Sequence, residues 1–231
     1  MSIPKVIHYC WFGGKAKPEV VEKCIQSWKD YLKDYEIIEW NEENFLVKNF
    51  EFTKKAYEDK KWAFVSDYCR LWVLYNYGGI YLDTDMEVLK PLDNLLENSS
   101  FGGLEDNEIA FGIWGCRRYD KFISEVLKYY NNLNYDYYKG KLNELAIPIH
   151  LTLIAKYLGY KESHSNISYF YNDVAIYPKE YFYPKRHAWQ EAVITKNTYT
   201  IHHYEGSWRK PHQIFRSKFK QELLKFIRGF K

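Results

Sequence analysis

Two aspartates stand two residues apart at the end of a short apolar run, GGIYLDTD, at residues 78–85. In an extended strand, side chains two residues apart point to the same face, so the carboxylates of Asp83 and Asp85 are expected to converge. Convergent carboxylates repel each other unless a proton or a cation neutralises them. A hard divalent cation that also binds substrate phosphates is the usual solution. The spacing therefore predicts a metal site that holds a diphosphate.

A second pair of charged residues lies on the helix predicted for residues 62–77, which leads directly into the aspartate segment. That helix is apolar on nearly all sides, which is typical of a buried helix, and the two glycines after it suit its C-terminal cap. Asp67 and Arg70 are three residues apart and share a face. Buried charges are retained when they are paired or serve a site. Two interpretations stay open: an internal ion pair, or a contribution to the metal site.

Composition limits the class of protein. The chain has 231 residues, of which 46% are hydrophobic, enough for one domain with a sizeable core. Aromatic residues make up 19%, with 23 Tyr and 8 Trp. So many rings suit surfaces that stack on sugars or bases, although a tyrosine-rich core is the alternative. The net charge of +3 with mixed signs does not favour a nucleic-acid binder, so no nucleic-acid partner is expected.

The sequence gives three indications of localisation. The first ten residues lack a secretory signal pattern, no window reaches the roughly 18 apolar residues of a membrane span, and the four cysteines lack CxxC spacing. These features predict a cytoplasmic protein. Residues 217–231 predict a basic amphipathic helix, which either binds the inner face of the cytoplasmic membrane or packs on its own domain.

Strands and helices alternate along the chain, which predicts an α/β fold with a mainly parallel sheet flanked by helices. Turn residues and hydrophobic periodicity place the boundaries of the elements. We expect strands at residues 3–12, 35–40, 108–116, 168–176 and 198–203, and helices at 18–31, 52–60, 62–77, 121–130, 149–158 and 217–231.

Four segments together resemble glycosyltransferase family 32. This DXD-containing family includes yeast mannosyltransferases and bacterial capsular polysaccharide glycosyltransferases, and the large clostridial glucosylating toxins are distant relatives. A DXD alone is a weak signal, but the ordered set is specific. The matching segments are IPKVIH (3–8), WFGG (11–14), AFVSDYCRLWVLYNYGGIYLDTD (63–85) and HHYEGSW (202–208).

The resemblance implies a GT-A fold, with a Rossmann-like sheet, in a single catalytic domain over residues 1–231. Residues 1–92 would form the nucleotide-sugar-binding half. Residues 93–216 would form the acceptor half and close the metal site, with 217–231 as the terminal helix. The family also implies a nucleotide-sugar donor, a divalent metal (Mn²⁺ or Mg²⁺) and retention of anomeric configuration.

The resemblance assigns roles to the charged residues. Asp85 would ligate the metal directly, and Asp83 would reach it directly or through water, or bind the ribose or sugar of the donor. Asp67 would accept hydrogen bonds from donor sugar hydroxyls. Arg70 would donate to sugar or phosphate oxygens, which suit a planar guanidinium.

The resemblance also places four residues around the nucleotide sugar. Trp11 matches a position that stacks on the base, with a tryptophan buried at the end of the first strand as the alternative. Tyr81 lies within the matched segment and is assigned to the donor site. Ser207 and Trp208 would close over the diphosphate.

A late histidine is expected to complete the metal site. His203 stands two residues after Ile201, so an apolar neighbour and a ligand share one strand face. The adjacent His202 would then point the other way. The resemblance and this spacing favour His203 as the ligand.

These inferences predict a metal-dependent retaining transferase that moves a hexose from a nucleotide sugar to a saccharide acceptor in bacterial surface polysaccharide synthesis. A UDP-sugar is favoured over GDP-mannose, and the acceptor would be an oligosaccharide or a lipid-linked saccharide. Two alternatives are a phosphohydrolase of the haloacid dehalogenase type, whose Asp-x-Asp normally follows the first strand, and a non-catalytic carbohydrate-binding protein. In the second alternative, the aspartates would have no function.

Overall fold

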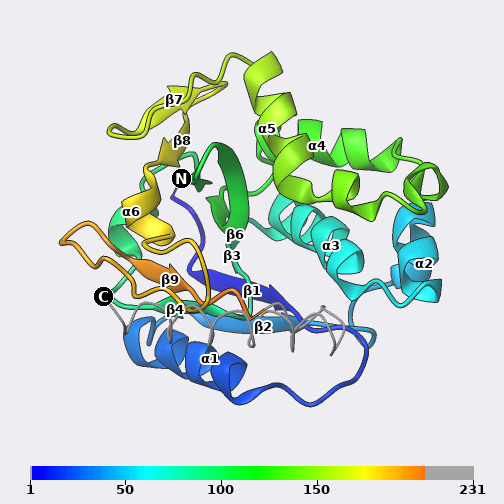
Figure 1. The fold of residues 1–231 in the computed structure, drawn as a ribbon, viewed down its shortest axis with the longest axis horizontal. Coiled ribbons are helices and arrows are strands. Elements are labelled where there is room, and N and C mark those ends of the chain that lie inside the picture. Colours follow the sequence, from blue (N-terminus) through cyan, green and yellow to red (C-terminus); the bar gives the residue numbers. More distant parts are fainter. Residues whose placement is uncertain (1, 206–231) are drawn as a thin grey trace, which may run out of the picture.

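Seven strands form one central sheet in residues 2–205, the part of the chain that the computed structural model describes (Figure 1). Their order across the sheet is β2-β1-β3-β6-β5-β8-β7. The strands are β1 (Val6–Cys10), β2 (Glu36–Trp40), β3 (Gly79–Leu82), β5 (Ser100–Glu105), β6 (Glu108–Cys116), β7 (Ser168–Phe170) and β8 (Val174–Tyr177).

The sheet is parallel where β1 lies between β2 and β3, and again where β5 pairs with β8. The pairs β3–β6, β5–β6 and β7–β8 are antiparallel. Because β1 and β3 run in the same direction, their carboxyl ends meet at one edge of the sheet. The residues that follow them, Trp11 and Asp83, are therefore brought to that edge.

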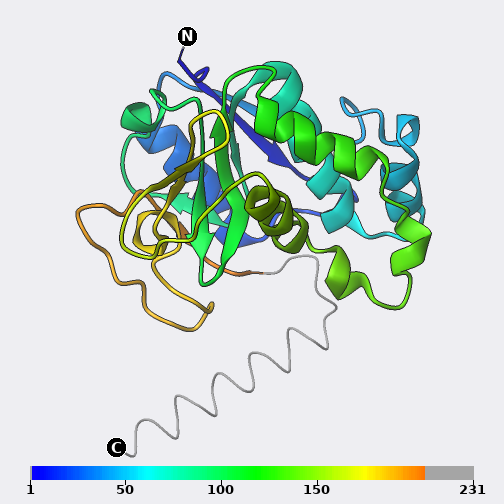
Figure 2. The same ribbon diagram turned by 90° about the horizontal axis from the view of Figure 1, so that it is seen from above.

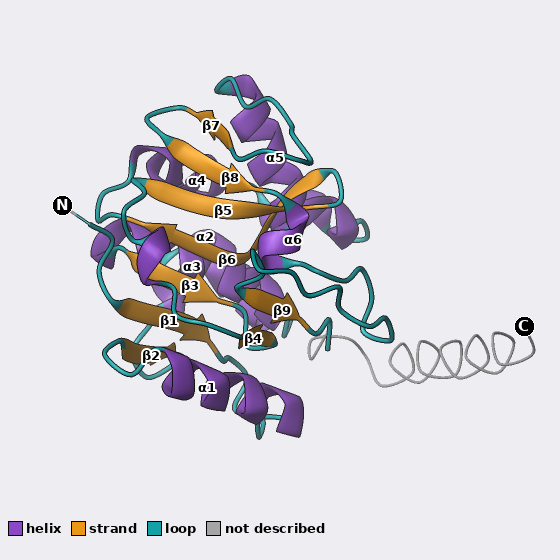
Figure 3. Ribbon diagram, turned by 90° about the vertical axis from the view of Figure 1, so that its left-hand side faces the viewer, coloured by secondary structure: helices purple, strands orange, loops and turns teal. Residues whose placement is uncertain are grey.

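Helices cover both faces of the sheet (Figures 1 and 3). On one face lie α1 (Glu19–Tyr31), α6 (Lys179–Phe182) and a two-stranded ribbon of β4 (Met86–Val88) and β9 (Thr200–His202). On the other lie α2 (Glu51–Glu58), α3 (Trp62–Tyr77), α4 (Lys121–Asn131) and α5 (Ile147–Tyr157). Short 3₁₀ helices occupy Val47–Asn49, Asp93–Leu95, Tyr135–Tyr138 and Leu142–Leu145.

Alternation along β3 divides the apolar residues between these two faces. Ile80 and Leu82 pack in the cluster on the α1 side, whereas Tyr81 packs in the cluster on the α3 side. All three are almost fully buried. The strand that leads to the aspartates is thus fixed from both faces.

The junction between α3 and β3 explains the two adjacent glycines. Gly78 ends the helix at φ 66°, and its N–H donates to the carbonyl of Leu74 at 2.9 Å. A Cβ at Gly79 would lie 2.7 Å from the carbonyl oxygen of Val6. Glycine therefore permits both the positive φ and the close approach that lets β3 start beside β1. The predicted helix at 62–77 is confirmed at both ends.

Four elements differ from the sequence-based expectations, and one of them is the short helix α6, at residues where no helix was expected. The strand expected at 168–176 is the hairpin β7–β8, which turns through Tyr171, Asn172 and Asp173 at positive φ. Neither β4 nor β5 was expected, because β4 has only three residues and β5 contains two glycines, a residue that weakens a strand pattern. The predicted terminal helix at 217–231 lies outside the described residues. Among those that are described, no helix has both the length and the apolar character to span a membrane.

Candidate active site

The two aspartates meet on a tight turn between β3 and β4. β3 ends at Leu82, and the N–H of Met86 donates to the carbonyl of Asp83 at 2.9 Å. The N–H of Asp83 donates to the carbonyl of Gly112 on β6 at 2.7 Å, which fixes the turn to the sheet. The expected convergence is present, but the expected extended strand is wrong: a turn brings the carboxylates together.

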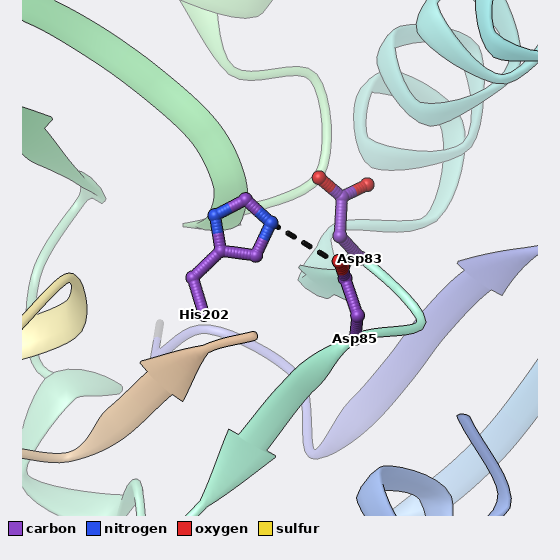
Figure 4. A group of neighbouring side chains, drawn as sticks. All are labelled: Asp83, Asp85 and His202. Carbon is purple, nitrogen blue, oxygen red and sulfur yellow. Dashed lines mark ion pairs between the residues drawn. The ribbon is translucent and has the colours of Figure 1, made fainter. Parts of the chain in front are cut away.

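The third member of the cluster is His202. β9 pairs antiparallel with β4, and its register places His202 opposite Met86, next to Asp85. Figure 4 shows the imidazole reaching from β9 toward the carboxylates of Asp83 and Asp85. One ligand atom from each of the three residues lies within 4.8 Å of the others, and His202 Nε2 is 3.3 Å from Asp85 Oδ1.

The prediction that His203 faces the aspartates is wrong. Its Nε2 lies 2.7 Å from Oε2 of Glu87, and its Nδ1 lies 3.5 Å from Nζ of Lys185. Neighbouring residues of a strand point to opposite faces, so a shift of one residue exchanges the two histidines. The β4–β9 pairing turns His202, not His203, toward the aspartates. The sequence did contain a signal for His202, because two adjacent histidines place one imidazole on each face of the strand.

Charges within the cluster shift two pKa values in opposite directions. Burial alone would raise the pKa of Asp85, but the His202 imidazolium and the N–H of Glu205, which donates to Oδ2 at 2.9 Å, hold it at about 2. Burial alone would lower the pKa of His202, but Asp85 and Asp83 raise it to about 9. A proton on the imidazole therefore favours its contact with the Asp85 carboxylate.

Arg70 connects Asp67 with Asp83. Its Nη2 lies 3.1 Å from Asp67 Oδ1, and its Nη1 lies 3.0 Å from Asp83 Oδ1. It also donates to the carbonyls of Phe111 at 3.1 Å and Ser66 at 3.3 Å. These contacts occupy most of the five N–H groups of the guanidinium. The internal ion pair is therefore confirmed, and Arg70 also contacts Asp83, whereas a contribution of the pair to a metal site stays a prediction.

Asp67 is the more deeply buried of the two carboxylates that Arg70 contacts. Burial raises the pKa of Asp67 to about 7, with Asp83 adding to the rise and Arg70 opposing it. Burial would lower the pKa of Arg70, but Asp83, Tyr81 and Asp67 raise it further. The guanidinium thus stays charged and holds Asp83 in place.

Tyr81 and Trp11 differ in their access to a ligand. Tyr81 is 1% exposed, and its hydroxyl donates a hydrogen bond to Asp83 Oδ1 at 3.0 Å. It therefore orients the carboxylate and is too deeply buried to contact a ligand itself. Trp11 is partly buried at the same edge of the sheet, and its indole N–H donates to the carbonyl of Lys15 at 2.6 Å. The assigned residues Ser207 and Trp208 lie outside the described residues.

The donor set of the cluster fits a divalent cation. Two carboxylate oxygens and one imidazole nitrogen are ligands that Mn²⁺ accepts, while Mg²⁺ prefers oxygen ligands. His202 must lose its proton to ligate a metal. Its Nδ1 is buried and finds no hydrogen-bond partner within residues 2–205.

A cleft of about 390 Å³ opens at the tip of the β5–β6 hairpin, beside the start of α5. The Glu105 carboxylate in its wall contributes to the raised pKa of His202, which indicates that this end of the cleft lies near the cluster. The lining residues are Glu105, Asp106, Asn107, Glu108, Ala110 and Pro148.

Comparison with known proteins supports the resemblance. Residues 18–102 match the family described as "Glycosyltransferase sugar-binding region containing DXD motif". Inositol phosphoceramide mannosyltransferase 3 of Schizosaccharomyces pombe is 31% identical over 123 residues, which cover 48% of this chain and 33% of that protein. Inositol phosphoceramide mannosyltransferase 2 of the same organism is 36% identical over 98 residues, covering 41% of this chain and 28% of that protein. The chain thus spans about a third of these relatives' length.

Among solved structures, the PaToxG glycosyltransferase superimposes with a TM-score of 0.56 at 19% identity, over 68% of this chain and 69% of that one. At this identity the likeness concerns the fold alone. The expected GT-A architecture, with its helix-flanked sheet, is confirmed.

Proposed function

We propose that this chain, whose residues 18–102 match the DXD-containing glycosyltransferase family, transfers a hexose from a nucleotide sugar to a saccharide acceptor with the help of a divalent cation. The observation that carries the proposal is the convergence of Asp83, Asp85 and His202 at the edge of the sheet where the parallel strands β1 and β3 end. In open α/β sheets, ligands bind beyond the carboxyl ends of the strands.

Asp83, Asp85 and His202 would hold the cation, which when bound stabilises the negative charge that develops on a departing diphosphate. Arg70 and Tyr81 orient the Asp83 carboxylate, and the N–H of Glu205 orients that of Asp85. Fixed ligands of this kind lower the reorganisation that the reaction requires. Trp11, which lies at the same edge of the sheet, would stack on the base of the nucleotide.

For the stereochemical course we propose retention by attack from the face of the leaving group. A double-displacement route would need an uncommitted carboxylate beneath the anomeric carbon. Asp67 is paired with Arg70 and Glu87 with His203, so neither of these two carboxylates is free to serve as that nucleophile. The protein would then act by positioning the two substrates and by electrostatic stabilisation.

For the donor, the names of the yeast relatives favour a mannosyl group over the UDP-hexose that the sequence favoured. We therefore propose GDP-mannose as the first donor to test, with UDP-sugars second. The same names point to an inositol phosphoceramide lipid, so a lipid-linked or oligosaccharide acceptor remains the proposed class. The cleft beside Glu105 is the proposed acceptor side. Neither a role in bacterial surface polysaccharide synthesis nor binding of residues 217–231 to a membrane has support beyond the sequence.

The test is hydrolysis of GDP-mannose, UDP-glucose, UDP-galactose and UDP-N-acetylglucosamine with Mn²⁺, Mg²⁺ or EDTA. We expect metal-dependent release of nucleoside diphosphate from at least one donor. Asp85→Asn should reduce the rate at least ~100-fold, since several kcal/mol of charge stabilisation are lost. The exposed Asp173→Asn is the matched control and should stay within about twofold.

Absence of nucleotide release from every donor, or full activity of Asp85→Asn, would refute the transferase. Release of inorganic phosphate from sugar phosphates would support the phosphohydrolase instead. Sugar binding without any turnover, unchanged in Asp85→Asn, would support a carbohydrate-binding protein.

A further inference from the structure

Lys185 is a buried lysine on the segment that connects α6 with β9. Figures 1 and 2 show α6, in yellow, beside the orange segment that contains β9, and the Thr200 hydroxyl donates to the carbonyl of Phe182 at 3.0 Å. The Tyr204 hydroxyl donates to the carbonyl of Lys185 at 3.0 Å. Only 7% of Lys185 is exposed. Its main chain is therefore fixed to the residues that follow β9, and its side chain lies in the interior.

The ammonium group of Lys185 has few partners for a buried charge. A lysine ammonium carries three N–H donors. The polar contact of Nζ within residues 2–205 is with His203 Nδ1 at 3.5 Å, which is longer than a usual hydrogen bond. Lys185 forms no ion pair with a carboxylate of the described residues, since the nearby carboxylates pair with histidines. Buried charges of this kind are costly, and they are retained when they serve a site.

The carboxylates nearest to Lys185 already have other partners. Glu87 Oε2 lies 2.7 Å from His203 Nε2, and Asp85 Oδ1 lies 3.3 Å from His202 Nε2. Burial lowers the pKa of Lys185, and the charges of Glu87 and Asp85 oppose this effect. The ammonium is thus within electrostatic reach of both carboxylates, although it pairs with neither.

The charge of Lys185 is surplus once the cluster is neutralised. With a divalent cation held by Asp83 and Asp85, these carboxylates would need no charge from a lysine. A diphosphate bound to the same cation would bring new negative charge close to the ammonium. Because Lys185 is buried, water screens its charge weakly, and a fixed charge in such a place stabilises an anion strongly.

We infer that the Lys185 ammonium is a second cation of the proposed active site and stabilises the diphosphate of the nucleotide sugar. This inference rests on the proposed function and extends it to a residue outside the matched segment 18–102. In the transfer, the bond from the anomeric carbon to the diphosphate oxygen breaks, and its electron pair stays on that oxygen. The acceptor oxygen bonds to the anomeric carbon and gives its proton to the departing diphosphate. Lys185 opposes the charge that develops on the leaving oxygen, so it favours the transition state over the bound donor.

The test replaces Lys185 with methionine, which keeps the length of the side chain and removes its charge. Titration calorimetry on the full chain measures the affinity for Mn²⁺ alone, and then for GDP and UDP in the presence of Mn²⁺. In Lys185→Met the affinity for the nucleoside diphosphate that the unchanged chain binds should fall at least about tenfold, because a charged partner is lost. The affinity for Mn²⁺ alone should not fall, since the variant has lost a positive charge near the carboxylates. The kcat of nucleotide release should fall at least about tenfold as well.

The matched control is Lys196→Met. Lys196 is an exposed lysine of the same segment between α6 and β9. Its replacement should leave the affinity for nucleoside diphosphates and the kcat within about twofold of the unchanged chain.

Thermal unfolding separates this role from a structural one. Removing a buried charge that has no carboxylate partner should not lower the melting temperature. Lys185→Gln is a second neutral variant and should give the same result. Melting temperatures at least about 5 °C lower in both variants, together with weaker binding of Mn²⁺ alone, would show that Lys185 holds the cluster itself and would overturn the inference.

The outcomes also distinguish this inference from the proposed function. A loss of diphosphate affinity smaller than about tenfold in both neutral variants would overturn the role of Lys185 and leave the transferase standing. If the unchanged chain bound neither GDP nor UDP with Mn²⁺, the proposed function would fail, and the inference would fail with it.

Discussion

Replacing Arg70 with methionine tests whether this residue organises the site through its buried contacts. The substitution keeps an apolar chain of similar length over the Tyr81 ring, from which the guanidinium carbon is now 4.5 Å. It removes the partner of Asp67 and of Asp83 Oδ1, and a donor to the Phe111 carbonyl. What remains is two carboxylates and a carbonyl without their shared donor.

The expected cost follows from what is left behind. Removing one partner of a buried ion pair costs about 3–5 kcal/mol, because the other charge stays buried. Protonation of Asp67, whose pKa is already raised to about 7, limits the loss to the lower part of this range. Asp67→Asn should cost less, about 1–2 kcal/mol. The double variant should be more stable than the sum of the two losses predicts, by at least about 1 kcal/mol.

Urea unfolding followed by far-UV circular dichroism at pH 7 measures these free energies. Titration calorimetry measures the affinity for Mn²⁺ as a second property. This affinity should fall about 10–100-fold in Arg70→Met, because Asp83 loses its orientation. Arg186→Met is the control, since Arg186 is exposed and contacts Asp106 at 3.0 Å in a surface ion pair. A loss below about 1 kcal/mol, or strictly additive variants, would refute the role assigned to Arg70.

Three further predictions test other parts of the structure. His202→Ala should weaken Mn²⁺ binding at least about tenfold in calorimetry and His203→Ala about threefold or less; the reverse order would restore the sequence-based assignment. Burial lowers the pKa of His8 from 6.5 to about 4, so the unfolded chain takes up a proton at that residue first as the pH falls. The free energy of unfolding should therefore fall by up to about 3 kcal/mol between pH 6.5 and pH 4. In His8→Gln this pH dependence should disappear, and the same pH dependence of urea unfolding in both chains would exclude the effect. A Cβ at Gly102 would lie 2.3 Å from the Trp114 ring, so Gly102→Ala should destabilise the chain by about 1–3 kcal/mol, and an unchanged melting temperature would contradict this packing.

Local patterns predicted two elements that pack beside the aspartates. α3 runs from Trp62 to Tyr77 as expected, because an apolar helix ends naturally at two glycines, and β6 was placed correctly at Glu108–Cys116. The same patterns missed β5, whose two glycines reflect tertiary packing: Gly102 makes room for the Trp114 ring of β6, and Gly103 makes room for the rings of Phe182 and Tyr183. The prediction of a site at Asp83 and Asp85 required only that two carboxylates converge.

The histidine could not be assigned in the same way. β4 and β9 are three residues long, too short for alternation to establish which side chains face the sheet. Their register is set by distant contacts, such as the bond from the N–H of Glu205 to Asp85 across 120 residues. The position of Arg70 beneath Asp83 likewise depends on the Phe111 carbonyl, 41 residues away.

The two aspartates are held by different parts of the chain, and this division bears on what the matched segment alone can do. Asp83 is fixed by Arg70, Tyr81 and the Gly112 carbonyl, whereas the main chain and carboxylate of Asp85 are fixed by the N–H groups of His203 and Glu205. Residues 18–102, which match the family, include neither Gly112 nor the segment after β9. The geometry that brings both carboxylates to one point therefore arises only when β6 and β9 pack against the matched segment, so the site is a property of the assembled fold.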